Sequence, residues 1–281
     1  MTNAAALLNV SQPSISKVLA HAEQQLGYRL FDRVKGKLVP TPEAHQLFAH
    51  VRAVYEDIDR LRHVETNIRA ASAGRIRIAS TPAFALEVLP RAVASFQQDH
   101  SDVVFEIETL HLDEINHALL ESRIDIGLAF NPVASPRIKE QKLASGHFVV
   151  LAPDNGEFDD RSEMSIEDLA EYPFIALNSR DPLGQALSDY IGTSKTELKI
   201  VTWTETYHVA KVLVACGRGL TIADDITARS VVAGSVRRIP LRPVLKFNVT
   251  AMHLANAPLS IGAKEFTRHL GNHLKEFLAE P

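Results

Sequence analysis

The sequence predicts an α/β protein with a small head, a long connecting helix and a larger two-part body. The chain has 281 residues, 46% of them hydrophobic and 23% charged, which is ordinary for a globular protein with room for several domains. Before residue 72 the apolar residues recur at helical spacing, and from residue 75 short apolar runs alternate with helical stretches. These three observations give the fold class.

A short amphipathic helix is expected over residues 12–26. Ser11 is a good N-cap, and Pro13 suits the first turn, where its missing N–H costs nothing. The apolar side chains that share one face are Ile15, Val18, Leu19, Ala22 and Leu26. Gly27 is expected to end the helix, because glycine readily adopts the left-handed conformation found at helix C-termini.

A basic hairpin is expected after this helix. Leu30-Phe31 and Leu38-Val39 form its two short strands around a tip at residues 34–37. Residues 1–40 hold five basic and two acidic side chains, whereas the whole chain has a net charge of −4. A basic head on an acidic body is typical of nucleic-acid binding through the head, although chance asymmetry in a short window gives the same pattern.

A long helix is expected to connect the head to the body. Thr41, Pro42 and Glu43 supply a cap, a first-turn proline and an acidic first turn, and the helix runs to about Ala71. Its apolar residues follow a heptad-like pattern: Leu47, Val51, Val54, Ile58, Leu61 and Ile68. We interpret this stripe as a dimerisation surface; the alternative is a long helix packed within one domain.

The body alternates strands with helices. The expected strands are residues 76–80, 103–109, 125–130, 148–153, 174–177, 198–203, 220–224 and 249–254. The expected helices are residues 85–99, 112–122, 165–171, 183–191, 206–216 and 262–279. This alternation predicts α/β layers with mainly parallel sheets, and the length predicts two subdomains.

Several functions are disfavoured by what the sequence lacks. No apolar stretch approaches the roughly 18 residues that span a bilayer, and no signal peptide is recognisable, so we expect a cytoplasmic protein. The single cysteine, Cys216, excludes a disulfide framework, and its apolar surroundings in the sequence predict a buried thiol. No hydrolase, metalloprotease or P-loop motif is present, so no enzymatic activity, cofactor or metal is expected.

The head closely resembles a known family. Residues 10–33 read VSQPSISKVLAHAEQQLGYRLFDR, and PTPEA follows at residues 40–44. This pattern is similar to the winged helix-turn-helix of LysR-type transcriptional regulators. In the body, GRIRIAS, RIDIGLA and CGRGLTIA resemble the family's effector domain, so the resemblance covers nearly the whole chain.

The family normally has a further helix ahead of this stretch, whereas only six residues precede Leu7 here. We therefore expect that the natural start lies upstream or that the product is truncated. The primary hypothesis is a ligand-responsive DNA-binding regulator. The alternative is a truncated small-molecule-binding protein that does not bind DNA, or a decoy that forms mixed dimers with intact relatives.

The resemblance implies which side chains face DNA. They are Ser11, Gln12, Pro13, Ser14, Ser16 and Lys17 on the helix, and Arg33, Lys35 and Lys37 on the wing. Glutamine can pair with adenine in the major groove and lysine with guanine or phosphate, whereas the wing side chains contact the DNA backbone or the minor groove.

The resemblance also implies a body like that of periplasmic solute-binding proteins. The expected domains are the head at residues 1–40, the linker at 41–72, subdomain I at 75–144 with 249–281, and subdomain II at 145–248. Two crossing strands near residues 145–151 and 246–253 would join the subdomains, with a small ligand held in the cleft between them.

Residues that follow the carboxyl ends of strands are expected to bind this ligand. They are Ser80, Thr81, Pro82, Thr109, Leu110, Asn178, Arg180, Asp181, Pro182, Leu183, Thr204, Thr206 and Ala223. The hydroxyl groups favour a small organic anion or an amino acid without choosing between them. Arg180 and Asp181 would read the two ends of an amino acid, or else lie in a solvated loop.

The expected partners follow from this hypothesis. They are double-stranded operator DNA, the small-molecule effector, a second copy of the chain through the linker helix, a homotetramer through the body, and RNA polymerase as a further partner. No membrane partner is expected.

Overall fold

A computed structural model describes residues 10–34, 37–48, 50–52, 54–55, 58, 74–133, 135–178, 181–230 and 236–279. The chain divides into two compact units, the head, Met1–Arg62, and the body, His63–Pro281. Within the described ranges, no helix combines the length and the hydropathy needed to cross a bilayer.

The described residues within 10–40 of the head form a helix and a two-stranded hairpin. Helix α2 (Gln12–Leu26) begins at the N-cap Ser11, whose side chain accepts a hydrogen bond from the backbone N–H of Ser14. It ends at Gly27, which has a φ of 78°. Strands β1 (Phe31–Val34) and β2 (Lys37–Pro40) then pair in antiparallel fashion. The capping chemistry expected from the sequence is thus present at both ends of the helix.

The linker helix begins at residue 42 and includes residues 42–48, 50–52, 54–55 and 58. The hydroxyl of Thr41 accepts a hydrogen bond from the N–H of Ala44 at 3.1 Å, so Thr41 caps the helix as expected. The remainder of the expected helix, including Leu61 and Ile68, lies outside the described residues.

The body is built around a mixed sheet. Its main strands are β3 (Arg75–Ser80), β4 (Val104–Thr109), β5 (Ile126–Phe130), β6 (Ile138–Pro153) and β11 (Lys246–Leu254). The order is β6-β11-β5-β3-β4, with β3 parallel to β4 and β5. Strand β11 is antiparallel to both neighbours, so the expectation of mainly parallel sheets is wrong for this part. Strand β11, which comes from the distant C-terminal segment, runs in the opposite direction.

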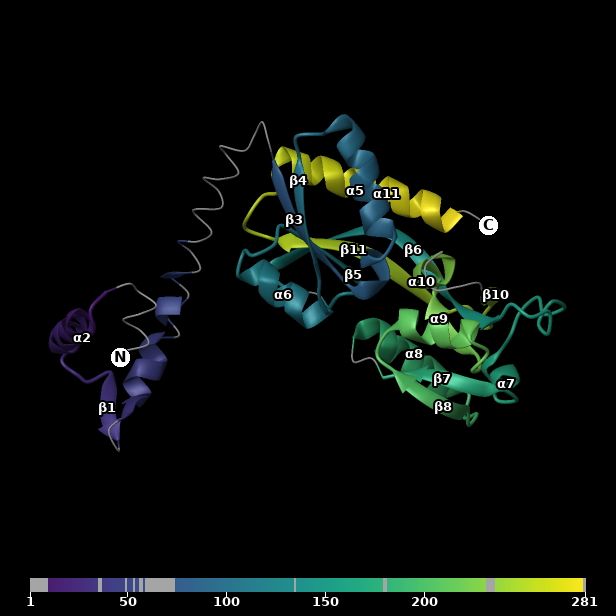
Figure 1. The fold of residues 1–281 in the computed structure, drawn as a ribbon, viewed down its shortest axis with the longest axis horizontal. Coiled ribbons are helices and arrows are strands. Elements are labelled where there is room, and N and C mark those ends of the chain that lie inside the picture. The colour runs from purple at the N-terminus through teal and green to yellow at the C-terminus, as the bar shows by residue number, and fades with distance from the viewer. Residues whose placement is uncertain are drawn as a thin grey trace. The chain divides into compact units, whose positions relative to one another are not determined.

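Helices cover both faces of this sheet (Figure 1). The helices are α4 (Pro82–Ala85), α5 (Val88–Asp99), α6 (Leu112–Leu120) and α11 (Ile261–Ala279). Helices α5 and α11 lie side by side on one face, and α6 lies on the other. Side chains along β3 point alternately to the two faces of the sheet. Ile76 and Ile78 therefore join the core under α5 and α11, whereas Ala79 joins the cluster under α6.

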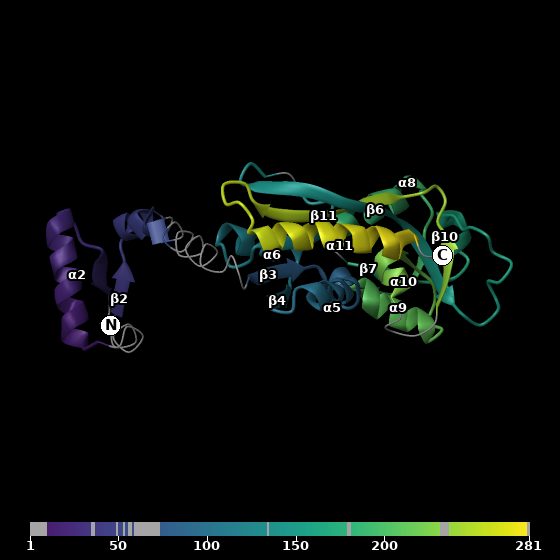
Figure 2. The same cartoon turned by 90° about the horizontal axis from the view of Figure 1, so that it is seen from above.

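The 16-residue strand β6 passes from this sheet into a second one (Figure 2). It pairs with β11 up to His147, and from Phe148 it pairs with β9 (Thr221–Asp224) and β10 (Val236–Pro240). We call the elements around β3–β5 and β11 the first lobe, and those around β7–β10 the second lobe. The second crossing between the lobes was expected near residues 246–253. Strand β11 already pairs within the first lobe from Lys246 onward, so the chain returns from the second lobe to the first before β11 begins.

The second lobe holds the remaining elements. They are α7 (Ile166–Leu169), β7 (Pro173–Leu177), α8 (Pro182–Thr193), β8 (Lys199–Thr204), α9 (Tyr207–Ala215) and α10 (Asp225–Arg229). Strands β7 and β8 are parallel. Sequence periodicity missed α10, β10 and the first half of β6, because these segments are short or carry many polar side chains. Cys216 is exposed at the C-cap of α9, so the expectation of a buried thiol is wrong.

A row of aromatic rings joins the two lobes. Phe130 of β5 lies 4.4 Å from Phe84 of α4 and 4.9 Å from Phe247 of β11, measured between ring centroids. The row continues from Phe247 to Phe148 at 5.7 Å and from Phe148 to Tyr207 of α9 at 6.4 Å. The two lobes therefore share one hydrophobic core.

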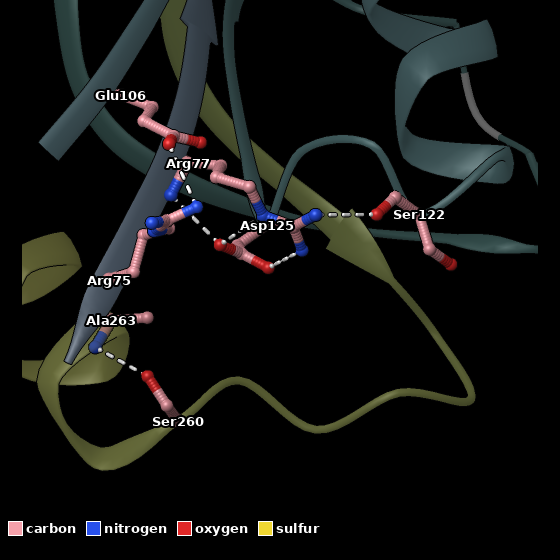
Figure 3. Close-up of polar contacts among 7 residues, drawn as sticks. All are labelled: Arg75, Arg77, Glu106, Ser122, Asp125, Ser260 and Ala263. Carbon is pink, nitrogen blue, oxygen red and sulfur yellow. Dashed lines mark hydrogen bonds and ion pairs between the residues drawn. The ribbon is translucent and has the colours of Figure 1, made fainter. Parts of the chain in front are cut away.

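Polar contacts fix the start of β3 (Figure 3). The Arg77 guanidinium donates to both carboxylate oxygens of Asp125, at 3.2 Å from Nε and 2.6 Å from Nη2. The backbone N–H of Arg77 also donates to Asp125, and Nη1 donates to the carbonyl of Ser122. This paired geometry ties the start of β3 to the turn that leads into β5.

Candidate functional site

Six of the nine residues expected to face DNA lie at the N-cap and in the first turns of α2. The hydroxyls of Ser11 and Ser14 are 2.8 Å apart, and Gln12 Nε2 donates to Ser16 Oγ at 3.3 Å. Ser11, Gln12, Pro13, Ser14 and Lys17 are exposed, and Ser16 is half-buried. The helix therefore presents these side chains together on an accessible stretch.

The other three expected residues belong to the wing. Arg33 is exposed on β1, Lys35 lies outside the described residues, and Lys37 is described only through its place in β2. Glu23 of α2 connects helix and wing, because its Oε1 accepts from the backbone N–H groups of Leu30 at 2.7 Å and Phe31 at 3.1 Å. One carboxylate thus orients the hairpin against the helix.

The body contains a cleft of about 840 Å³ between its lobes. The first lobe contributes His111, Leu112, Asp113, Asn116 and Val133. The second lobe contributes Asn178, Asp181, Pro182, Gln185, Ala186, Asp189 and Glu205. Most of these residues belong to the N-terminal turns of α6 and α8, which begin where β4 and β7 end.

A smaller inner pocket of about 30 Å³ adjoins the cleft, and His111, Asp181 and Glu205 line both. The other residues of the pocket wall are Thr81, Pro82, Ala83, Phe130, Leu183, Thr206, Tyr207, His208 and Thr227. Because a water molecule needs about 10–15 Å³ of such space, the inner pocket suits a small polar group rather than a whole ligand.

Among the residues that the structure describes, two hydroxyl groups of the inner pocket have no hydrogen-bond partner. They belong to Thr81 and Tyr207, each 7% exposed. The hydroxyl of fully buried Thr227 interacts with the carboxylate of Asp224. A buried polar group without a partner costs about 1–3 kcal/mol, so such groups in native proteins call for a functional explanation. A polar ligand group in the pocket would supply these missing partners.

Burial controls the charges around this pocket. Burial, together with the neighbouring Lys211, lowers the pKa of His208 to about 4, so its imidazole is neutral at neutral pH. Burial raises the pKa of Asp224 to about 6, and burial with the nearby carboxylates of Asp224 and Asp181 raises the pKa of Tyr207 well above 10. Apart from the carboxylates of Asp181 and Glu205, which it shares with the cleft, the inner pocket is therefore lined by neutral donors and acceptors.

Lys211 fixes the wall that carries Thr227. It is 1% exposed, and its Nζ donates to the carbonyl oxygens of Thr227 and Ala228 at 3.1 Å and to that of Ser230. Asp224 caps the same helix, because its Oδ1 accepts from the N–H of Thr227 at 2.8 Å. Both ends of the short α10 are thus held, which positions the Thr227 hydroxyl.

The structure brings part of the expected effector set together. The expected residues that line the cleft or the inner pocket are Thr81, Pro82, Asn178, Asp181, Pro182, Leu183 and Thr206. Arg180 lies outside the described residues. The remaining expected residues, Ser80, Thr109, Leu110, Thr204 and Ala223, line neither.

The residues that line neither the cleft nor the inner pocket are located at the ends of strands or within a strand. Ser80 and Thr204 lie at strand ends, and their carbonyls accept from the N–H groups of Leu110 and Asn178, respectively. Ala223 is buried in β9 against β6. Thr109 ends β4 opposite Ser80. The residues that reach the cleft lie one or two positions further along the chain.

Sequence reasoning missed several residues of the wall. Four of them lie within a few positions of an expected strand end: His111, Glu205, Tyr207 and His208. They would have been found if the stretch considered after each expected strand had been a few residues longer. Thr227 gave no such signal, because α10 was not expected. In the part of the chain that the structure describes, no cluster of histidine, cysteine and carboxylate side chains has the geometry of a metal site.

Comparisons with known proteins cover both units. Residues 1–45 match the family model of bacterial regulatory helix-turn-helix proteins of the lysR family, and residues 69–275 match the LysR substrate binding domain. The transcriptional regulator DgcR of Pseudoalteromonas sp is 37% identical over 97% of this chain and 94% of its own length. The transcriptional activator LysR of Escherichia coli K12 is 26% identical over 96% and 87%, respectively.

Solved structures share the fold. The LysR family regulator HinK of Pseudomonas aeruginosa has a TM-score of 0.65 at 21% identity, covering 96% of this chain and 91% of its own. The effector binding domain of QuiR in complex with shikimate has a TM-score of 0.61 at 19% identity, covering 73% and 99%. The chain belongs to the LysR family of ligand-responsive, DNA-binding transcriptional regulators.

Proposed function

We propose that a small polar organic molecule binds in the cleft between the lobes and thereby changes DNA binding by the head. The observation that carries the proposal is the inner pocket, where the hydroxyls of Thr81 and Tyr207 are buried without partners among the described residues. The complexes of QuiR with shikimate and of the CcmR regulatory domain with 2-PG support a small polar ligand for this fold.

A thermal-shift screen of carboxylic acids and amino acids, followed by DNA binding with and without each hit, tests this proposal. Thr81→Val removes a hydroxyl at nearly constant volume, and we expect it to weaken binding of a hit about tenfold. Thr109→Val is the matched control, because Thr109 lines neither the cleft nor the inner pocket. Equal loss in both variants would contradict the site.

The proposed DNA contacts are those of α2 and the wing, namely Ser11, Gln12, Pro13, Ser14, Ser16, Lys17, Arg33, Lys35 and Lys37. The exposure of Gln12, Lys17 and Arg33 supports them. We expect Lys17→Ala with Lys35→Ala to weaken binding to DNA selected from a random pool by the wild-type protein. We also expect the plot of log affinity against log salt concentration to become shallower, by about one in slope for each lysine removed from a phosphate.

An unchanged salt slope in this double variant would count against the assigned contacts. If the wild-type chain bound ligand but no DNA from the pool, the small-molecule-binding alternative would replace the regulator.

The proposed dimer forms through the linker helix. Val51, Val54 and Ile58 of the expected stripe are exposed in the single chain, as are Phe48 and Tyr55 beside them. We expect Val51→Asp with Ile58→Asp to shift the sedimentation of the protein toward the monomer. Charge substitutions at the already polar and exposed Glu43 and Gln46 should leave it unchanged.

The proposed tetramer forms through the body. Exposed apolar side chains on β4 (Val104 and Ile107) and on β8 (Ile200, Val201 and Trp203) support further association. We also propose the domain limits given by the sequence, 1–40, 41–72, 75–144 with 249–281, and 145–248. The change of partners along β6 at residues 147–148 supports the central boundary.

A further inference from the structure

The described wall of the outer cleft is strongly acidic. Four carboxylates line it, Asp113 on α6, Asp181 at the N-cap of α8, Asp189 on α8, and Glu205 between β8 and α9. Among the residues described there, the wall includes no lysine or arginine, and its one histidine is His111. Such a wall favours a cationic group and disfavours a ligand that is purely anionic.

Part of this charge serves the fold. Asp181 Oδ1 accepts from the N–H of Gly184 at 2.7 Å as the N-cap of α8, and Asp189 Oδ1 accepts from Gln185 Nε2 at 2.7 Å. Asp113 lies in the first turn of α6, where a negative charge is favourable. Glu205 differs, because it is exposed and has no hydrogen bond or ion pair in the described structure.

The inner pocket shares Asp181 and Glu205 with the cleft, but its other side carries groups that favour an anion. It presents the hydroxyls of Thr81 and Tyr207, which have no partner among the described residues, and it lies at the N-terminus of the nine-residue helix α9. Hydroxyl donors and the positive end of a helix dipole both favour an anionic oxygen. Glu205 precedes the N-cap Thr206 directly, so the acidic side chain and the donor set are neighbours along the chain.

We propose that the cleft ligand is an amino acid, with its carboxylate in the inner pocket and its ammonium group against Glu205 and Asp181 at the mouth. This inference rests on the proposed function, since it names the ligand class of the same cleft. A simple carboxylic acid would leave the carboxylates of Glu205 and Asp181 without a cationic partner. A simple amine would leave the hydroxyls of Thr81 and Tyr207 and the N-terminus of α9 without an anion.

The test uses the full chain and matched sets of three probes. Each set contains an amino acid, the same molecule with hydrogen in place of the ammonium group, and the same molecule with hydrogen in place of the carboxylate. We expect at least one amino acid to bind in calorimetry, and each truncated counterpart to bind about tenfold or more weakly.

Glu205→Gln keeps the side-chain shape and removes its charge. We expect this variant to raise the Kd of the bound amino acid about tenfold, while the deaminated acid binds as well as before or better. Glu276→Gln on α11 is the matched control, since Glu276 is an exposed carboxylate outside the cleft.

Three results would overturn this inference: a deaminated acid that binds as tightly as its amino acid, an unchanged Kd in Glu205→Gln, or no binding by any amino acid. A deaminated acid that binds in the cleft and alters DNA binding would leave the proposed function intact. A bound ligand of any class that fails to alter DNA binding would instead contradict the proposed function.

Discussion

The head and the body are stabilised in different ways. In the described part of the head Thr41 alone is buried, and α2 has no buried side chain. In the body, large side chains such as Phe84, Phe247 and Phe266 are fully buried in a core that both lobes share.

The described part of the head is held by a few directed polar contacts, whereas the body depends on apolar burial. Glu23 holds the wing, and the hydroxyl of Thr41 donates to the carbonyl of Arg29 at 2.9 Å. Each such bond contributes about 1 kcal/mol, whereas burying a large apolar side chain contributes about 2 kcal/mol or more. Substitutions in the two units should consequently differ in size and in kind.

The largest expected effect comes from the shared core. Phe247 is 1% exposed and contacts the rings of Phe130 and Phe148. We expect Phe247→Ala to lower the free energy of unfolding of the body by about 3–5 kcal/mol in urea titrations. In the head, the side chain of Val18 is 70% exposed, so we expect Val18→Ala to change the free energy of unfolding of the head by less than about 0.5 kcal/mol. Similar decreases in unfolding free energy in both variants would contradict the proposed difference between the head and the body.

The second prediction concerns pH, because Asp224 and His208 are buried ionisable groups of the body. The folded chain raises the pKa of Asp224 from 3.8 to about 6, so Asp224 makes the unfolding free energy fall as pH rises through that window. It lowers the pKa of His208 from 6.5 to about 4, so His208 makes the unfolding free energy fall as pH drops through its window.

Each of these effects amounts to about 3 kcal/mol, and they oppose one another. Asp224→Asn should therefore leave a body whose unfolding free energy rises with pH between 4 and 6.5, and His208→Gln should give the reverse slope. Urea unfolding at a series of pH values measures both. The exposed control Asp160→Asn should keep the wild-type profile, and a flat profile in Asp224→Asn would contradict the assignment.

The third prediction concerns the head. Glu23→Ala removes the acceptor of two backbone N–H groups, and we expect it to destabilise the wing by about 1–3 kcal/mol. Hydrogen exchange at Leu30 and Phe31 should accelerate while the melting of the body stays unchanged. Gln24→Ala, at the neighbouring exposed position, is the control. A lower melting temperature or faster exchange throughout the body would show that the two units are not independent.

The smallest expected effect concerns glycines. Gly27 has a φ of 78° and open space around its Cα, so Gly27→Ala should cost only about 1 kcal/mol of backbone strain in the head. Gly192 also has open space but lies within α8, so Gly192→Ala should stabilise the body by about 0.5–1 kcal/mol. Thermal unfolding of the two variants should give opposite signs.

Much of the fold was predictable because local chemistry decided it. Ser11, Pro13 and Gly27 marked the ends of α2, and the apolar runs located seven of the eight expected strands to within about three residues at each end. The eighth, at residues 148–153, proved to be the second half of β6. Its first half carries exposed polar side chains, and its strand geometry depends on pairing with β11, which is about 100 residues away in sequence.

The cleft was less predictable for the same reason. Thr81, Asp181 and Thr206 were expected because they follow strands or cap helices. Thr227 and Lys211 could not be placed, because their positions depend on how α9 and α10 pack together. The sequence pattern marks where strands end, but tertiary packing decides which side chains reach the space between lobes.

The aromatic row from Phe84 to Tyr207 has a consequence for how the body can be divided. Since Phe148 belongs to one lobe and Phe247 to the other, cutting the chain between them would leave each fragment with an unfinished core. Neither piece should be expressible as a stable, independent protein. Ligand-sensing modules for fusion or transplantation should therefore span the whole of residues 74–279.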